Sequence, residues 1–293
     1  MSQIVTQTLA AWTPRVDAAA ARTLAAELEA GRALYYPHLD FAVEAAERRF
    51  LDPRWSDGRA KNISYDGARD QIKGAAGNES DLAALRGMIA RFRAQAIGLV
   101  NGLFPAYRDA LRIGLTSFRP MPVAGRTGSW RKDDARLHID AFPSRPNQGE
   151  RILRVFSNVN PNGISRDWRV GEPFPALVER FLPRLRAPLP GSAALLRALR
   201  LTKSRRSDYD HYMLGLHDAM KADLDYQRNG FQQAVPFAAG STWVCYSDQL
   251  AHAVSGGQFL LEQTLHLAPV RQYDPEAAPL RVLERALGRP LAP

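Results

Sequence analysis

Apolar residues recur with two different periods along this chain. In its N-terminal part the spacing is close to 3.6, which is typical of amphipathic helices. We therefore predict helices over 8–50, interrupted at Gly31 and Pro37, and another over 81–104. The expected N-cap of the second helix is Ser80 or Asp81.

From about residue 111 the period changes to two, which indicates half-buried strands bounded by Pro, Gly, Asn and Asp. An insertion over 161–235 separates the third predicted strand from the fourth and contains a predicted helix near 208–228. The predicted strands are 111–119, 137–142, 151–157, 241–246 and 259–267.

This order of elements indicates an α+β protein whose strands form a barrel or a sandwich with a ligand at its mouth. The length of 293 residues allows one large domain or two ordinary ones, and we predict a single domain, 1–293. Its expected parts are a helical N-terminal layer (1–108), a β core with the insertion (109–272) and a C-terminal tail (273–293) with a short helix near 280–287.

The composition is that of a globular protein, with 45% hydrophobic and 24% charged residues. No apolar run approaches the length needed to cross a bilayer. The first residues lack the basic and apolar regions of a secretory signal, and the single cysteine, Cys245, cannot form an internal disulfide. We expect a soluble protein in a reducing compartment, with Cys245 buried in a strand.

The charge is uneven. Lys and Arg (39) exceed Asp and Glu (30) by 9, and the segment 180–206 carries basic residues and no acid. Residues 192–206 fit an amphipathic basic helix, which suits an anionic membrane surface, although a solvated basic face is an equal alternative. No aromatic residues alternate with these cations as in a surface that stacks on bases, so nucleic acid is not expected as a partner.

His138 and Asp140 carry the clearest chemistry. Residues two apart on a strand point to the same face, so an imidazole and a carboxylate would converge there. His252, on a later strand, would complete the two-histidine, one-carboxylate triad that holds non-heme Fe(II) and leaves coordination positions open. A second His-x-Asp sequence, at His38 and Asp40, lies where we expect a helix, on which positions two apart diverge, so it is not expected to chelate.

The order of these ligands resembles the double-stranded β-helix (jelly roll) of Fe(II)/2-oxoglutarate dioxygenases. A cation must bind the far carboxylate of 2-oxoglutarate, yet the last predicted strand has no Lys or Arg. Arg154, on an apolar strand face, is the first candidate and Arg119 the second. Arg151 is expected to be a surface charge at a strand end.

Three segments resemble a particular family, the hydroxylases of Kdo (3-deoxy-D-manno-oct-2-ulosonic acid). They are HIDAFPSRPNQGERILRVFSNVNP at 138–161, RDWRVGEPF at 166–174 and KNISY at 61–65. The resemblance implies Fe(II), 2-oxoglutarate and O2 as cofactor and co-substrates, and hydroxylation of carbon 3 of Kdo in Kdo-lipid A to give Ko, with succinate and CO2. It also implies that Arg119, Arg154 and Trp168 surround 2-oxoglutarate.

We therefore expect a Kdo 3-hydroxylase with His138, Asp140 and His252 as metal ligands, working at the cytoplasmic face of the inner membrane. The alternatives are a hydroxylase of another anionic or lipid-linked substrate, or a non-enzymatic β-barrel that binds anions. The sequence leaves open whether the chain forms a homo-oligomer. His211 and His217 are expected to be surface or hydrogen-bonded residues without a role.

Overall fold

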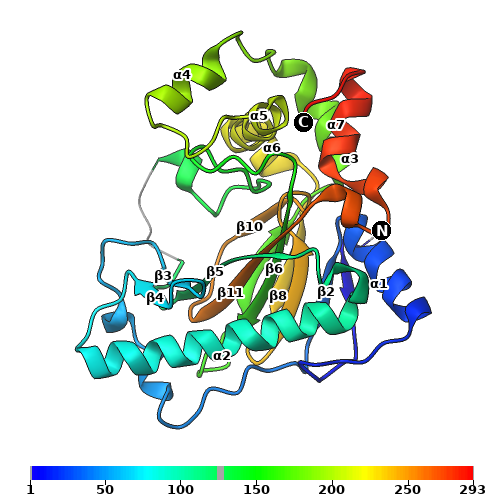
Figure 1. Cartoon of the computed structure of the whole chain (residues 1–293). Helices are drawn as coiled ribbons and strands as arrows, with labels where there is room; N and C mark the ends of the chain where they lie inside the picture. The colour runs from blue at the N-terminus through cyan, green and yellow to red at the C-terminus, as the bar shows by residue number, and fades with distance from the viewer. Residues whose placement is uncertain (1, 124–128, 293) are drawn as a thin grey trace.

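The computed structural model describes residues 2–123 and 129–292, so residues 1, 124–128 and 293 of the predicted regions lie outside it. Strands and helices alternate irregularly and build a mixed helix-and-sheet fold (Figure 1). The strands are β1 Ile4–Thr6, β2 Ala33–Tyr36, β3 Ile63–Asp66, β4 Gln71–Lys73, β5 Arg112–Arg119, β6 Arg151–Asn158, β7 Arg166–Val170, β8 Gln233–Phe237, β9 Thr242–Tyr246, β10 His252–Val254 and β11 Leu260–Leu267. The helices are α1 Ala18–Glu29, α2 Glu79–Leu103, α3 Phe174–Phe181, α4 Ser192–Ala198, α5 Asp208–Ala222, α6 Leu224–Asn229 and α7 Pro279–Leu287.

Eight strands form one large sheet in the order β1-β2-β9-β6-β11-β5-β3-β4. β11 lies between β5 and β6 and is antiparallel to both, so the last strand pairs with two much earlier ones. All eight residues of β6 are buried, which places this strand at the centre of the sheet.

A second, antiparallel sheet has the order β10-β7-β8. His138 extends it by one residue, because its backbone N–H and C=O both bond to His252 at 3.0 and 2.8 Å. The predicted strand 137–142 is thus reduced to one antiparallel bridge, in an otherwise irregular segment.

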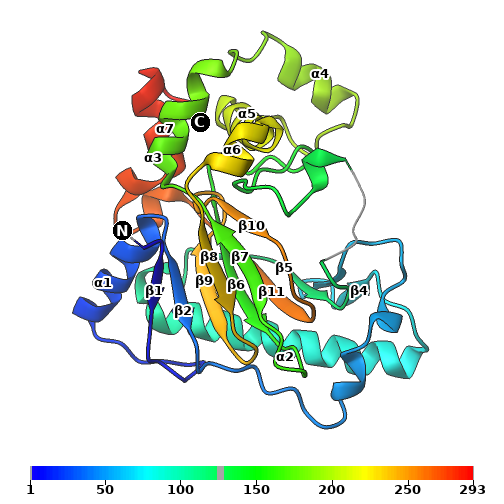
Figure 2. The same ribbon diagram turned by 180° about the vertical axis from the view of Figure 1, so that it is seen from behind.

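The helices cover the sheets on different sides. α2 crosses the large sheet and packs on it with buried residues such as Phe92 and Leu99, while α3, α5, α6 and α7 gather at the opposite end of the molecule (Figures 1 and 2). These helices share a second apolar core, to which Phe181, Leu216 and Leu283 belong. The first core includes residues from Ala25 to Leu267, so N-terminal helices and late strands are packed together.

Four of the five predicted strands and the helices α2 and α7 agree with the sequence prediction to within a few residues. Asn78, rather than Ser80 or Asp81, caps α2, since its side chain accepts a hydrogen bond from the backbone N–H of Asp81. The predicted helix 208–228 is divided between α5 and α6, and the residue between them, Asp223, has extended backbone and caps α6.

The predictions for 8–50 and for the insertion need correction. Only α1 is α-helical in 8–50; β2 follows it and joins the large sheet, and His38 and Asp40 lie in irregular chain. The expected helical layer before residue 109 therefore also contributes four strands, β1 to β4, to the large sheet. Helix α4 is shorter than the predicted basic helix over 192–206.

In the chain outside residues 1, 124–128 and 293, no helix is both long and apolar enough to span a membrane.

Candidate metal centre and co-substrate pocket

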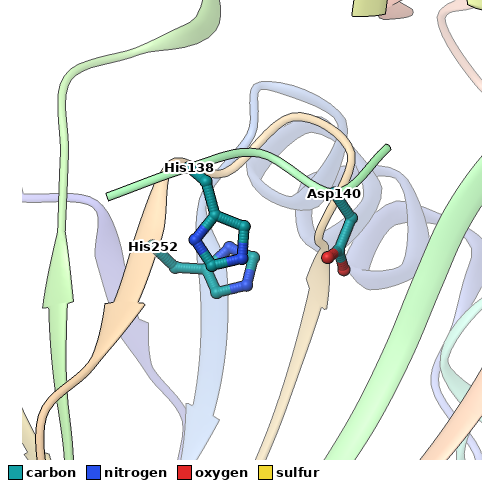
Figure 3. Close-up of side chains that lie close together, drawn as sticks. All are labelled: His138, Asp140 and His252. Carbon is teal, nitrogen blue, oxygen red and sulfur yellow. The ribbon is translucent and has the colours of Figure 1, made fainter. Parts of the chain in front are cut away.

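His138, Asp140 and His252 lie together where the irregular segment before β6 meets the start of β10 (Figure 3). One ligand atom from each lies within 4.8 Å of the others. The backbone N–H of Asp140 donates to the carbonyl of Ser247 at 2.8 Å, so both ends of this short segment are fixed to the chain that leads into β10. Hydrogen bonding between segments far apart in sequence thus assembles the cluster.

Both imidazoles are oriented by backbone carbonyls. Nδ1 of His138 lies 2.7 Å from the carbonyl oxygen of Arg136, and Nδ1 of His252 lies 2.9 Å from that of Leu250. Because a carbonyl only accepts, Nδ1 carries the proton in each ring and Nε2 is left with its lone pair. Burial lowers the pKa of both histidines, which keeps the rings neutral, as metal ligands require.

Asp140 is ionised although it is buried in the site. Burial by itself would raise the pKa of this carboxyl, but the charge of Arg154, with Nη2 3.0 Å from Oδ2, holds it well below its ordinary value. Apart from this ion pair, Oδ2 accepts no hydrogen bond among the described atoms. Two neutral imidazoles and an ionised carboxylate with an oxygen to offer fit a divalent transition metal.

Arg119 on β5 and Arg154 on β6 meet at one acid, Glu262, which lies between them on β11. Nη1 of Arg154 is 2.6 Å from Oε1 of Glu262, and Arg119 pairs with Oε2. Burial would raise the pKa of Glu262, but Arg119 and Arg154 lower it. This acid was not singled out from the sequence; the available signal was a carboxylate within a predicted strand, next to Gln263 and Thr264.

Trp168 on β7 stacks on the second histidine, with ring centroids of Trp168 and His252 4.9 Å apart and an interplanar angle of 20°. Phe156 and Trp243 pack against its edge. The indole is 2% exposed, so it forms a dry wall beside the candidate metal ligands.

Arg119, Arg154 and Trp168 also fit 2-oxoglutarate. Buried N–H groups of Arg119 (Nε), Arg154 (Nε) and Trp168 (Nε1) have no acceptor among the described atoms, and all three side chains line the same cavity as the metal ligands. Such donors suit carboxylate oxygens. The charges of Arg119 and Arg154 are balanced by Glu262 and Asp140, so a divalent metal and a dianionic co-substrate would enter together without a net change in charge.

The cavity has a volume of about 1250 Å³, enough for more than the co-substrate. Among its described lining residues, Lys and Arg outnumber Asp and Glu. Exposed cations, Lys132, Arg145 and Lys203, lie on its lining, which therefore suits a large anionic ligand.

Helix α5 brings two further residues to the cavity, His217 and Lys221. His217 was expected to lie outside the site. It is hydrogen-bonded, with Nδ1 2.9 Å from Asp218, but its ring also stands edge-on to that of His138, with centroids 5.5 Å apart. The contact between His217 and His138 joins segments far apart in the chain, so no spacing of residues in the sequence could have predicted it. His211 is hydrogen-bonded to the carbonyl of Arg186, as expected of a residue outside the site.

The prediction for Arg151 is wrong. Its side chain is fully buried and its Nε donates to Asp248 at 2.8 Å, while Nη1 donates to Gln272 at 2.8 Å. The guanidinium lies 3.8 Å from the ring centre of Tyr246. A buried carboxylate on the turn after β9 balances the charge, which the sequence could not show.

The basic segment 180–206 is mostly surface. α4 and its flanks expose the large apolar side chains Leu189, Leu195, Leu199 and Leu201, each at least 59% exposed. Cys245 is buried, as predicted.

Comparison with known proteins identifies the family. The sequence profile of the 3-deoxy-D-manno-oct-2-ulosonic acid (Kdo) hydroxylases matches residues 11–290. Among curated proteins no match is found.

Solved structures of the Kdo hydroxylase KdoO, a non-heme Fe(II) α-ketoglutarate-dependent dioxygenase, are similar throughout. The structure with cobalt(II) is 47% identical with a TM-score of 0.96, covering 99% of this chain and 98% of that one. The structure with α-ketoglutarate and Fe(III) is 46% identical with a TM-score of 0.95, covering 99% and 97%. The prediction made from the three sequence segments is confirmed: this chain belongs to the Kdo hydroxylase family.

Proposed function

We propose that this protein is an Fe(II)- and 2-oxoglutarate-dependent dioxygenase that hydroxylates carbon 3 of Kdo in Kdo-lipid A, giving Ko, succinate and CO2. One observation carries the proposal. In a chain 47% identical to KdoO, two neutral histidines and an ionised aspartate converge beside unpaired buried donors in one large cationic cavity. Iron with 2-oxoglutarate and O2 supplies the oxidising power for attack on an unactivated C–H bond.

The chain contributes binding, orientation and exclusion of water. His138, Asp140 and His252 would hold Fe(II), the histidines through Nε2, because each Nδ1 is committed to a carbonyl. Arg119 and Arg154 would bind a carboxylate of 2-oxoglutarate, with Glu262 holding their side chains in place. Trp168 would pack beside the co-substrate and exclude water from it.

The fold supports this proposal. We propose that the two sheets are the walls of a double-stranded β-helix, in which β5, β11, β6 and β9 form one wall and the His138 segment, β10, β7 and β8 the other. We also propose a single domain, since one apolar core joins α1, α2 and late strands.

We propose further that the exposed leucines and cations of 180–206 rest on the cytoplasmic face of the inner membrane. Apolar side chains would enter the headgroup boundary while Lys and Arg contact anionic headgroups. A lipid-linked sugar could then reach the cavity, where Lys203 and Arg145 suit the phosphates of lipid A.

Mass spectrometry of Kdo-lipid A tests the proposal. The purified protein is incubated with Fe(II), ascorbate, 2-oxoglutarate and O2. The expected product is heavier by one oxygen and forms only when 2-oxoglutarate is present. If succinate forms but the lipid gains no oxygen, the protein is still a 2-oxoglutarate-dependent dioxygenase but Kdo-lipid A is not its substrate. If iron-loaded protein forms neither product, the proposed enzymatic activity is rejected.

A further inference from the structure

A buried lysine in the cavity, Lys221, forms no ion pair with an acid of the described residues. Lys221 is 1% exposed and lines the cavity from α5. Its Nζ donates to the carbonyl of Arg131 at 3.0 Å, and across 2–123 and 129–292 no Asp or Glu oxygen lies within 4.0 Å of it. An ammonium has three donors, so most of its hydrogen-bonding capacity is left for a ligand.

Other charges around it are paired. The pairs are Arg119 and Arg154 with Glu262 and Asp140, Lys61 with Asp134, and Arg131 with Asp218. Lys221 therefore adds positive charge that these pairs do not balance. A buried charge is costly unless it is paired, so the lysine favours binding of an anion.

Lys221 is held close to the metal ligands by the segment that carries His138. Gln227 bonds to both the N–H and the C=O of Leu137, at 2.7 and 3.0 Å, and Arg136 donates to the carbonyl of Lys221 at 2.7 Å. His217 lies four residues before Lys221, on the same face of α5, and contacts the ring of His138.

The charges of these groups act on one another. Burial lowers the pKa of Lys221, opposed by Asp134 and, more weakly, by Asp140. The positive charge of Lys221 in turn contributes, after burial and His252, to the low pKa of His138.

The chemistry of the sugar defines where its carboxylate must lie. In a 3-deoxy-2-ulosonic acid, carbon 1 is the carboxylate, carbon 2 the anomeric centre and carbon 3 the methylene. The methylene is two bonds from the carboxylate carbon. When carbon 3 faces the metal centre, the carboxylate must therefore lie near the proposed metal ligands. Lys221 lines the same cavity as these residues, and its charge acts on His138.

We propose that Nζ of Lys221 binds the carboxylate of the sugar and so fixes which carbon faces the metal centre. This inference rests on the proposed function. It predicts that the enzyme recognises sugar acids and rejects the same sugar with its carboxylate neutralised.

Equilibrium binding tests the proposal without turnover. The probes are the methyl glycoside of Kdo and its C1 methyl ester, titrated calorimetrically into cobalt(II)-loaded protein with 2-oxoglutarate. The wild type should bind the acid about 10- to 100-fold more tightly than the ester, as expected for a hydrogen bond to a charged group. Lys221→Met should remove this preference, Lys221→Arg should restore part of it, and the matched control Lys73→Met, on the exposed edge strand β4, should keep it.

A preference that survives Lys221→Met in folded protein would overturn the proposal, as would a wild type that binds acid and ester equally. The comparison of acid with ester in the wild type needs no variant. Equal binding of the two would therefore overturn the proposal even if Lys221→Met does not fold. Failure here is distinct from failure of the proposed function, because the wild type would still add oxygen to Kdo-lipid A. Absence of that product would reject the proposed function instead.

Discussion

At the scale of single residues, protonation decides what the cavity can bind. The two histidines present Nε2 because backbone carbonyls occupy Nδ1, and Asp140 stays ionised because Arg154 lies beside it. Each proposed ligand is thus oriented or kept ionised by a group that is not itself a proposed ligand.

Replacing one ligand should remove activity without unfolding the chain. We expect His252→Ala, like His138→Ala or Asp140→Ala, to lower product formation at least about 100-fold, because loss of a ligand should exceed the effect of losing its supporting hydrogen bond. Product is measured by mass spectrometry, bound iron by elemental analysis and folding by circular dichroism. The matched control is His211→Ala, outside the cavity. Near-normal turnover with iron bound would exclude that residue as a ligand.

The two arginines should control the requirement for 2-oxoglutarate. Arg154→Ala would remove the proposed donor to the carboxylate of 2-oxoglutarate, and we expect the KM for 2-oxoglutarate to rise about 10- to 100-fold at saturating iron. Arg119→Ala should act in the same direction, while Arg285→Ala, on the exposed face of α7, should not. An unchanged KM in Arg154→Ala would assign the carboxylate to Arg119 alone.

At the scale of elements, the centre depends on strands held in register. Arg151 at the start of β6 bonds to Asp248, in the turn after β9, and the neighbouring Ser247 accepts from Asp140. The turn that supports the carboxylate ligand is therefore fixed by a buried ion pair.

Breaking this ion pair should destabilise the fold. We expect Arg151→Met to lower the free energy of unfolding by roughly 3–5 kcal/mol, because Asp248 is left buried and unpaired. Chemical denaturation measures the change. Arg285→Met, which breaks an exposed pair with Glu276, should cost less than about 1 kcal/mol.

The double variant Arg151→Met/Asp248→Leu separates a buried-charge effect from a packing effect. It should regain part of the lost stability, since no unpaired charge remains. A double variant less stable than Arg151→Met would contradict this explanation.

At the scale of the whole molecule, the excess of positive charge is concentrated in the segment that carries α4. Cations exceed acids by 9 over the chain, the segment 180–206 has no acid, and α4 with its flanks also exposes leucines. The side with this segment also carries the cations Arg145 and Lys203 of the cavity lining. Membrane attachment and substrate entry would therefore share one face.

Removing charge from this face should weaken membrane binding. We expect the joint replacement of Arg200, Lys203, Arg205 and Arg206 by Gln to cost about 1 kcal/mol per residue in binding to vesicles containing anionic lipid. Sedimentation with vesicles measures it. The control replaces four exposed arginines of the N-terminal part by Gln: Arg15, Arg22, Arg54 and Arg59. Equal binding by both variants would identify the segment as a solvated face.

The sequence by itself determined the family, the strands with period two and the residues proposed as metal ligands, because these depend on local spacing and short motifs. His138 and Asp140 are two apart, which on the predicted strand places both side chains on one face. The structure brings them together although only His138 forms a β-bridge. β5, β6, β9 and β11 were predicted for the same reason.

Only the tertiary structure decided which charges are buried together. Glu262 meets Arg119 and Arg154 because β11 lies between β5 and β6, and Asp248 neutralises Arg151 across strands far apart in sequence. β2 is a strand because β1 and β9 flank it, although its sequence continues a helical pattern. Lys221 lines the same cavity as the proposed metal ligands because α5 and α6 are hydrogen-bonded to the segment before His138. Pairing of distant segments leaves no periodic signal in either partner, so the arrangement of charge around the centre follows from the fold alone.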